Sequence, residues 1–169
     1  MTSVSLRTIR LRPGEEHREE KEVALEPLWL GGQRYLPVPE KVPSELVVSR
    51  ASSGTVFELR FRTRLHGPCY RCLADAVVDV DVAGREYQAT STEGSDELTT
   101  PYVENDQLDL TAWARDALVL ELPDKILCRP DCAGLCPVCG RDLNVEPHAH
   151  DDKELDSRWA ALSELRDRL

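Results

Sequence analysis

The spacing of the six cysteines constrains this chain more than any other feature of its sequence. Two cysteines form a Cys-x2-Cys unit at 69–72, and the other four lie within 128–139, where the last two repeat the unit. Two cysteines at this spacing in a tight turn can direct both sulfurs at one ion. Gly140 directly follows the second unit and supplies the positive φ that such a turn requires. The cysteines therefore indicate metal ligands presented by turns.

The rest of the sequence favours a metal over disulfides. The N-terminus has no apolar leader and no small-residue cleavage site, and no apolar run is long enough to span a membrane. These features predict a cytoplasmic protein, in which thiols stay reduced. Redox sensing by thiolates beside Arg71 or Arg129 is the competing use of the cysteines, and zinc ligation would suppress it.

Zinc is the expected ion, and two ligand schemes are open. In the first, Cys69, Cys72, Cys136 and Cys139 bind one ion, and Cys128 and Cys132 are spare. In the second, two ions divide eight ligands: Cys69, Cys72, Cys128 and Cys132 at one site, and Cys136, Cys139, His148 and His150 at the other. In either scheme protein fills every coordination position, which is typical of structural zinc and excludes an open catalytic site.

The clearest secondary structure is a β-hairpin. Residues 55–66 alternate strictly, with Phe57, Leu59 and Phe61 on one face and arginines on the other, and residues 76–89 repeat the alternation. Gly67–Cys72 is the expected tip, and 45–51 is an expected neighbouring strand. The period of 4–11 decides neither helix nor strand. A charged loop should follow it, and the prolines and glycines of 23–45 predict turns with short extended pieces.

The C-terminal half predicts helices. Residues 91–107 should form an acidic loop. The following segment should form an amphipathic helix capped by Asp109 and stopped by Pro123, with one apolar stripe: Leu110, Trp113, Ala114, Ala117 and Leu118. A terminal helix is expected within 154–169. The predicted fold is α+β: residues 1–127 form a small antiparallel sheet or partial barrel with one helix, and the Cys-rich segment and terminal helix of 128–169 pack on the same domain.

The motifs, in this order, resemble a known bacterial family. CYRCLADA, LDLTAWARDALVLELP, CRPDCAGLCPVCGRDLN and DSRWAALSELRDRL together are similar to the YceD family of large ribosomal RNA subunit accumulation proteins. The resemblance implies a role in accumulation of 23S ribosomal RNA, with ribosomal RNA, a large-subunit precursor or a ribosomal protein as partner, and it implies no enzymatic activity. Many family members carry Cys-x-Cys where this chain has His148 and His150, which supports these histidines as ligands.

Charge locates one candidate contact for such a partner. The net charge is −10, yet residues 1–72 hold 12 Lys and Arg against 9 Asp and Glu. The candidate stripe comprises Arg60, Arg62, Arg64 and Arg71, and Tyr70 and Trp113 are candidate stacking groups. The alternative is that Asp79 and Asp81 on the neighbouring strand neutralise these arginines.

The sequence thus predicts a non-enzymatic, zinc-binding protein of large-subunit ribosome biogenesis. The alternative, from another class, is a zinc- or redox-responsive regulatory module that binds a basic protein. No histidine has a plausible catalytic partner in the sequence.

Overall fold

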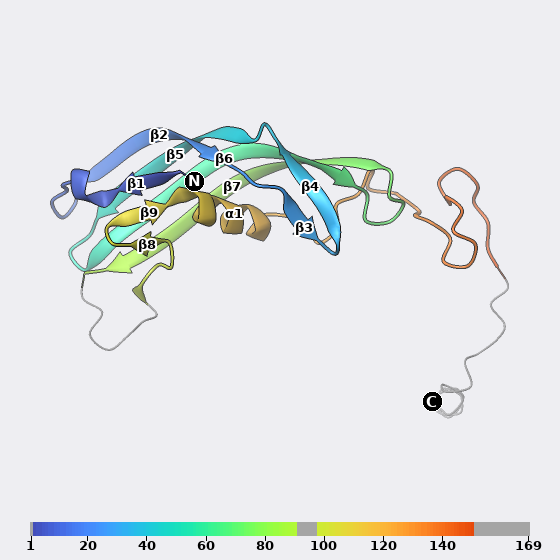
Figure 1. The fold of residues 1–169 in the computed structure, drawn as a ribbon. Helices are drawn as coiled ribbons and strands as arrows, with labels where there is room; N and C mark the ends of the chain where they lie inside the picture. The colour runs from blue at the N-terminus through green and yellow to red at the C-terminus, as the bar shows by residue number, and fades with distance from the viewer. Residues whose placement is uncertain (1, 91–97, 151–169) are drawn as a thin grey trace, which may run out of the picture.

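The computed structural model describes residues 2–90 and 98–150 and is dominated by antiparallel strands (Figure 1). Its elements, in chain order, are β1 (Ser3–Ser5), the 3-10 helix η1 (Leu6–Thr8), β2 (Glu16–Ala24), β3 (Leu28–Leu30), β4 (Gln33–Val38), β5 (Lys41–Arg50), β6 (Gly54–Pro68), β7 (Asp75–Ala89), β8 (Val103–Glu104), β9 (Gln107–Asp109) and α1 (Leu110–Leu120). The described part is compatible with the expected α+β class.

The strand β6 is the centre of the larger sheet. It pairs with β7 along its whole length, and with β5 and then β4 along the opposite edge. The edge strand β2 pairs with β5, and β3 pairs with β4. A second, three-stranded sheet has the order β1-β9-β8. In the described residues β2 pairs only with β5 and β7 only with β6, so the larger sheet does not close into a complete barrel.

The alternation predicted for β6 is confirmed. The inward set is buried and belongs to the core: Phe57, Leu59, Phe61, Thr63 and Leu65. The arginines between them face solvent. One face of the hairpin can therefore pack against other elements while the other face stays polar.

The helix α1 packs on β7, β2 and β1, and Figure 1 shows it alongside the sheet. All five residues of its predicted apolar stripe are buried. Gly84 of β7 makes room for Trp113, because a Cβ at Gly84 would lie 3.0 Å from Trp113 Nε1. The Asp109 side chain accepts a hydrogen bond from the Ala112 amide, as a helix N-cap should. The helix ends at Leu120, before Pro123. No helix in the described ranges is long and apolar enough to cross a membrane.

Two expectations about strands are wrong. The charged stretch Glu16–Ala24 is the edge strand β2 rather than a loop. The proline-rich stretch forms the strands β4 and β5 rather than mainly turns. Pro37 is in the part of β4 that pairs only with β6, and Pro43 precedes the part of β5 that pairs with β6. A proline is tolerated at such positions because the strand has only one neighbour there.

Two boundaries also differ from prediction. The strands of the hairpin continue to Pro68 and restart at Asp75, so its turn is Cys69–Ala74. The end of the expected acidic loop contributes β8 and the first residue of β9. The stretch 4–11, which the sequence left undecided, contains the end of β1 and the whole of η1. The expected terminal helix within 154–169 lies outside the described residues.

The helix cap gives a direct test of this fold. Replacing Asp109 with Ala should lower the free energy of unfolding by about 1 kcal/mol, because the Ala112 amide loses its acceptor. Asp109→Asn is the matched control and should remain close to the unmodified protein, since Asn caps equally well. Urea unfolding followed by tryptophan fluorescence measures both, and an equal loss in the two variants would contradict the capping role.

Candidate metal centre

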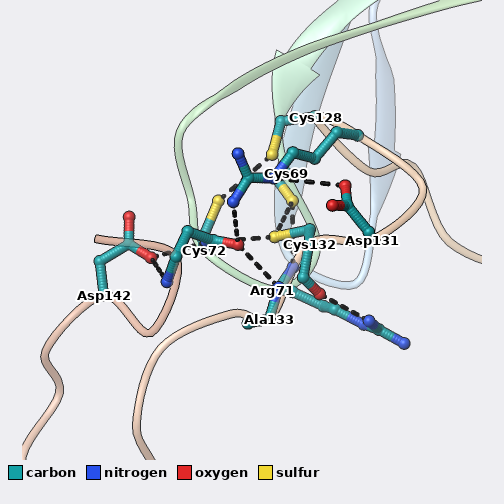
Figure 2. A network of polar contacts seen from close by, with 10 residues as sticks. Cys69, Arg71, Cys72, Cys128, Asp131, Cys132, Ala133 and Asp142 are labelled. Atoms are coloured by element: carbon teal, nitrogen blue, oxygen red, sulfur yellow. Dashed lines mark hydrogen bonds and ion pairs between the residues drawn. The ribbon is translucent and has the colours of Figure 1, made fainter. Parts of the chain in front are cut away.

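The turn between β6 and β7 meets the segment that follows α1, and four cysteines converge there. Figure 2 shows the sulfurs of Cys69 and Cys72, from the turn, and of Cys128 and Cys132, from that segment, directed toward one another. Their Sγ atoms all lie within 4.8 Å of one another. We call these four residues group one.

The sulfur separations in group one match a tetrahedral zinc site. Cys69 Sγ lies 3.8 Å from Cys132 Sγ, and Cys72 Sγ lies 3.6 Å from Cys128 Sγ. Four sulfurs around zinc, with Zn–S bonds of about 2.3 Å, are about 3.8 Å apart. All six cysteines of the chain are free thiols. The donor type, number and spacing therefore suit one zinc ion.

Both Cys-x2-Cys units adopt the same backbone turn. The Leu73 amide donates to the Cys69 carbonyl at 3.0 Å, and the Gly140 amide donates to the Cys136 carbonyl at 2.8 Å. The residue after the second cysteine has a positive φ in each unit, 63° at Leu73 and 72° at Gly140. The positive φ expected at Gly140 is therefore confirmed, and Leu73 adopts the same conformation at the cost of a left-handed backbone.

Hydrogen bonds to sulfur favour the thiolate form of one cysteine of group one, Cys69. The Arg71 amide donates to Cys69 Sγ at 3.4 Å. Burial raises the pKa of the Cys69 thiol, but hydrogen bonds from backbone amides outweigh burial and lower this pKa to about 6. The thiolate is the form that binds metal, so the turn favours the ligand state of this sulfur.

Backbone contacts hold the two segments of group one together. The Tyr70 amide donates to the Ile126 carbonyl at 2.8 Å, and the Leu135 amide donates to the Arg71 carbonyl at 3.1 Å. The Arg71 guanidinium donates to the Cys132 carbonyl at 2.6 Å. The relative position of the turn and the segment therefore depends on these hydrogen bonds as well as on the sulfurs.

A second set of donors, which we call group two, comprises Cys136, Cys139, His148 and His150, and its ligand atoms also lie within 4.8 Å of one another. Cys139 Sγ lies 3.1 Å from His148 Nε2. His148 Nδ1 lies 2.8 Å from the Glu146 carbonyl, which suits a tautomer that leaves Nε2 free to bind a metal. The backbone amide of Cys139 is the main cause that lowers the pKa of the Cys136 thiol to about 6.

The two groups differ in burial and in chain separation. Three of the four cysteines in group one are buried, and its two segments are 56 to 63 residues apart. Group two takes its donors from 136–150, and Cys139 and His150 are exposed. The geometry corresponds to the two-ion scheme. It does not bring Cys69 and Cys72 together with Cys136 and Cys139, as the one-ion scheme requires.

Asn144 is a site residue that the sequence did not indicate. Its side-chain amide lies 3.5 Å from Cys132 Sγ and donates toward it, and its carbonyl oxygen accepts from the Ala133 amide and from Arg129 at 2.7 Å each. Asn144, which lies between Cys139 and His148 in the chain, therefore links the group two segment to a group one sulfur. No spacing pattern identifies such a residue, because its role depends on how the loop folds back.

The basic stripe is largely neutralised within the protein. Arg62 pairs with Asp81 across the hairpin, Arg64 pairs with Asp79 at 2.7 Å, and Arg60 lies 3.5 Å from Glu58. Tyr70 is exposed, with Lys125 Nζ lying 5.3 Å from the centre of its ring.

Trp113 is a core residue with 2% exposure. It lies close to Tyr102, with ring centres 6.2 Å apart. The expectation that Trp113 stacks on a partner is therefore wrong.

Comparison with known proteins identifies a family. Residues 57–166 match the family described as large ribosomal RNA subunit accumulation protein YceD. The chain is 38% identical to the uncharacterized protein Rv2926c of Mycobacterium tuberculosis over 125 residues, which is 72% of this chain and 60% of the relative. It is 28% identical to the uncharacterized protein YlbN of Bacillus subtilis over 135 residues, 79% of this chain and 76% of the relative. The match thus spans less than two thirds of the mycobacterial protein. No solved structure matches the chain significantly.

The left-handed backbone at Leu73 leads to a prediction. Leu73→Gly should raise the free energy of unfolding by up to about 1 kcal/mol, because glycine adopts this φ without steric cost. Leu73 is 56% exposed, so removing its side chain should cost few packing contacts. Leu73→Ala keeps the backbone cost and should bring no gain. Chemical unfolding of the two variants measures the difference, and a Gly variant no more stable than the Ala variant would refute the prediction.

Proposed function

Since the chain belongs to the family of large ribosomal RNA subunit accumulation proteins, YceD, we propose that it is a non-enzymatic zinc protein acting in the accumulation of 23S ribosomal RNA. Its partner in this proposal is ribosomal RNA, a large-subunit precursor or a ribosomal protein, and its location is the cytoplasm. The observation that supports the zinc is the geometry of group one, whose sulfurs are 3.6 and 3.8 Å apart in pairs.

The proposed zinc is structural and occupies two sites. Each group offers four protein donors, a closed set that leaves no position for substrate or water. A cross-link at group one closes a loop of about 60 residues, which lowers the unfolded-state entropy by the equivalent of about 4 kcal/mol. The ion would join the sheet domain, 1–127, to the Cys-rich segment that begins at 128.

A second candidate function is a zinc- or redox-responsive module that binds a basic protein. The exposure of Cys139 and of His150 in group two favours this candidate, because accessible ligands exchange metal and meet oxidants more readily than buried ones. An overall charge of −10 also suits a basic partner.

Metal counting tests the two-site proposal. Mass spectrometry of the purified protein under native conditions should find about two zinc ions per chain. His148→Ala with His150→Ala should lose one ion and keep the fold, because group two is local. Cys69→Ser with Cys132→Ser should lose the other ion and lower the melting temperature more, because group one joins distant segments. A count of one in the unmodified protein, or a count unchanged by the histidine substitutions, would contradict the scheme.

Sedimentation of a cell lysate tests the role in ribosome biogenesis. The protein should travel with large-subunit precursors on a sucrose gradient, and its depletion should lower the amount of 23S ribosomal RNA relative to 16S. The small-subunit RNA is the internal control. A protein found only with free protein partners, together with an unchanged RNA ratio, would favour the second candidate function.

A further inference from the structure

A cavity at the end of the sheet far from the cysteines carries three arginines. Its volume is 820 Å³, and its lining includes Arg10, Arg12 and Arg50 together with two acidic residues, Glu15 and Asp106. Both carboxylates already have partners, since Glu15 accepts from the Arg12 backbone amide and Asp106 pairs with Arg7. It lies where β5 ends and β6 begins, whereas group one lies beyond the other end of β6. At 3.3 Å per residue, the length of β6 separates the two by about 45 Å. Figure 1 shows η1 and the Cys-rich segment at opposite ends of the molecule.

Arg50 is held in place without being neutralised. Its guanidinium donates to Thr55 Oγ1 at 2.8 Å and to Thr90 Oγ1 at 3.2 Å. Both acceptors are neutral hydroxyls, and within 2–90 and 98–150 no carboxylate forms an ion pair with Arg50. These two bonds fix the plane of the guanidinium and leave further N–H groups for an anion.

The loop that carries Arg10 and Arg12 is fixed against the same strand end. The Gly14 amide donates to the Arg50 carbonyl at 2.7 Å, and the Arg50 amide donates to the Glu15 carbonyl at 3.0 Å. The Glu15 carboxylate accepts from the backbone amide of Arg12 at 2.8 Å. In the described part of the chain neither Arg10 nor Arg12 has a carboxylate bound to its guanidinium, so both charges are available at the cavity.

The cavity is therefore a better anion site than the stripe on β6. Arg62 and Arg64 of the stripe are each paired with an aspartate of β7, so a ligand would have to displace those carboxylates. The net charge of −10 opposes any anion, but the Debye length is about 8 Å at physiological salt, so distant charges are largely screened and local charges decide.

We propose that this cavity binds a nucleotide of single-stranded RNA, and the choice of RNA rests on the function proposed above. The phosphodiester would be held by Arg10, Arg12 and Arg50, and the half-buried aliphatic side chains of Leu6 and Ile9 would contact sugar and base. A cavity accepts a nucleotide splayed out of a single strand and excludes a duplex. Its volume falls within the range of about 300 to 1,000 Å³ that is usual for ligand sites.

Binding of a labelled oligoribonucleotide of about ten nucleotides, followed by fluorescence anisotropy, tests the proposal. The variant Arg10→Gln/Arg12→Gln removes two unpaired charges, and the control Arg62→Gln/Arg64→Gln changes the net charge equally. The cavity variant should weaken binding at least tenfold, and the slope of log K against log salt should shrink by about 1.4, or 0.7 per lost phosphate contact. The control should weaken binding far less. Both pairs of arginines are exposed, and circular dichroism confirms folding.

Four results would overturn the proposal: no binding of the oligonucleotide to the unmodified protein, equal weakening in the two variants, a salt slope unchanged in the cavity variant, or equally tight binding of a glutamate-rich peptide of the same charge. Tight binding of the peptide would assign the cavity to an acidic protein segment. Sedimentation with large-subunit precursors separates the two proposals. If the protein sediments with large-subunit precursors but does not bind the oligonucleotide, only the proposed RNA site is wrong. If the protein neither sediments with the precursors nor binds the oligonucleotide, the proposed function is wrong as well.

Discussion

The contact between the β6–β7 turn, Cys69–Ala74, and the segment 126–135 determines how the rest of the molecule is arranged. Backbone hydrogen bonds from Tyr70 to Ile126 and from Leu135 to Arg71 join the two segments, and the sulfurs of group one converge between them. Because β6 is the central strand and the segment follows α1 directly, this contact fixes the C-terminal side of the helix relative to the sheet. The strand β9 and the Asp109 cap fix the other side.

Each group of candidate ligands contains its own Cys-x2-Cys turn of the same form. The groups differ in which part of the chain a bound ion would stabilise. Group one joins parts of the chain that the unfolded state keeps far apart, so an ion bound there would contribute to the stability of the whole domain. Group two joins neighbours within 136–150, so an ion there orders only its own loop. Asn144 belongs to the loop of group two, and its side-chain amide near Cys132 Sγ gives this loop a contact with group one.

Sequence periodicity predicted the elements that have one buried and one solvated face. The alternation of Phe57, Leu59 and Phe61 and the stripe of α1 depend only on local spacing, and both were found buried. The strand β2 was not predicted because eight of its nine residues are not buried, so its sequence lacks an apolar alternation. Backbone pairing with β5 holds it in the sheet instead. Spacing also singled out the eight candidate ligand residues that the structure brings together in two groups. It left their pairing open, because that pairing depends on a contact across 56 to 63 residues.

The locality of group two has an evolutionary consequence. All four of its donors belong to one continuous loop that contributes no strand to either sheet. A lineage can therefore gain, lose or exchange this loop, or swap histidine for cysteine within it, without breaking the ladder of strands on which the domain is built. Group one permits no such freedom, since altering either of its halves disturbs a junction between remote parts of the polypeptide.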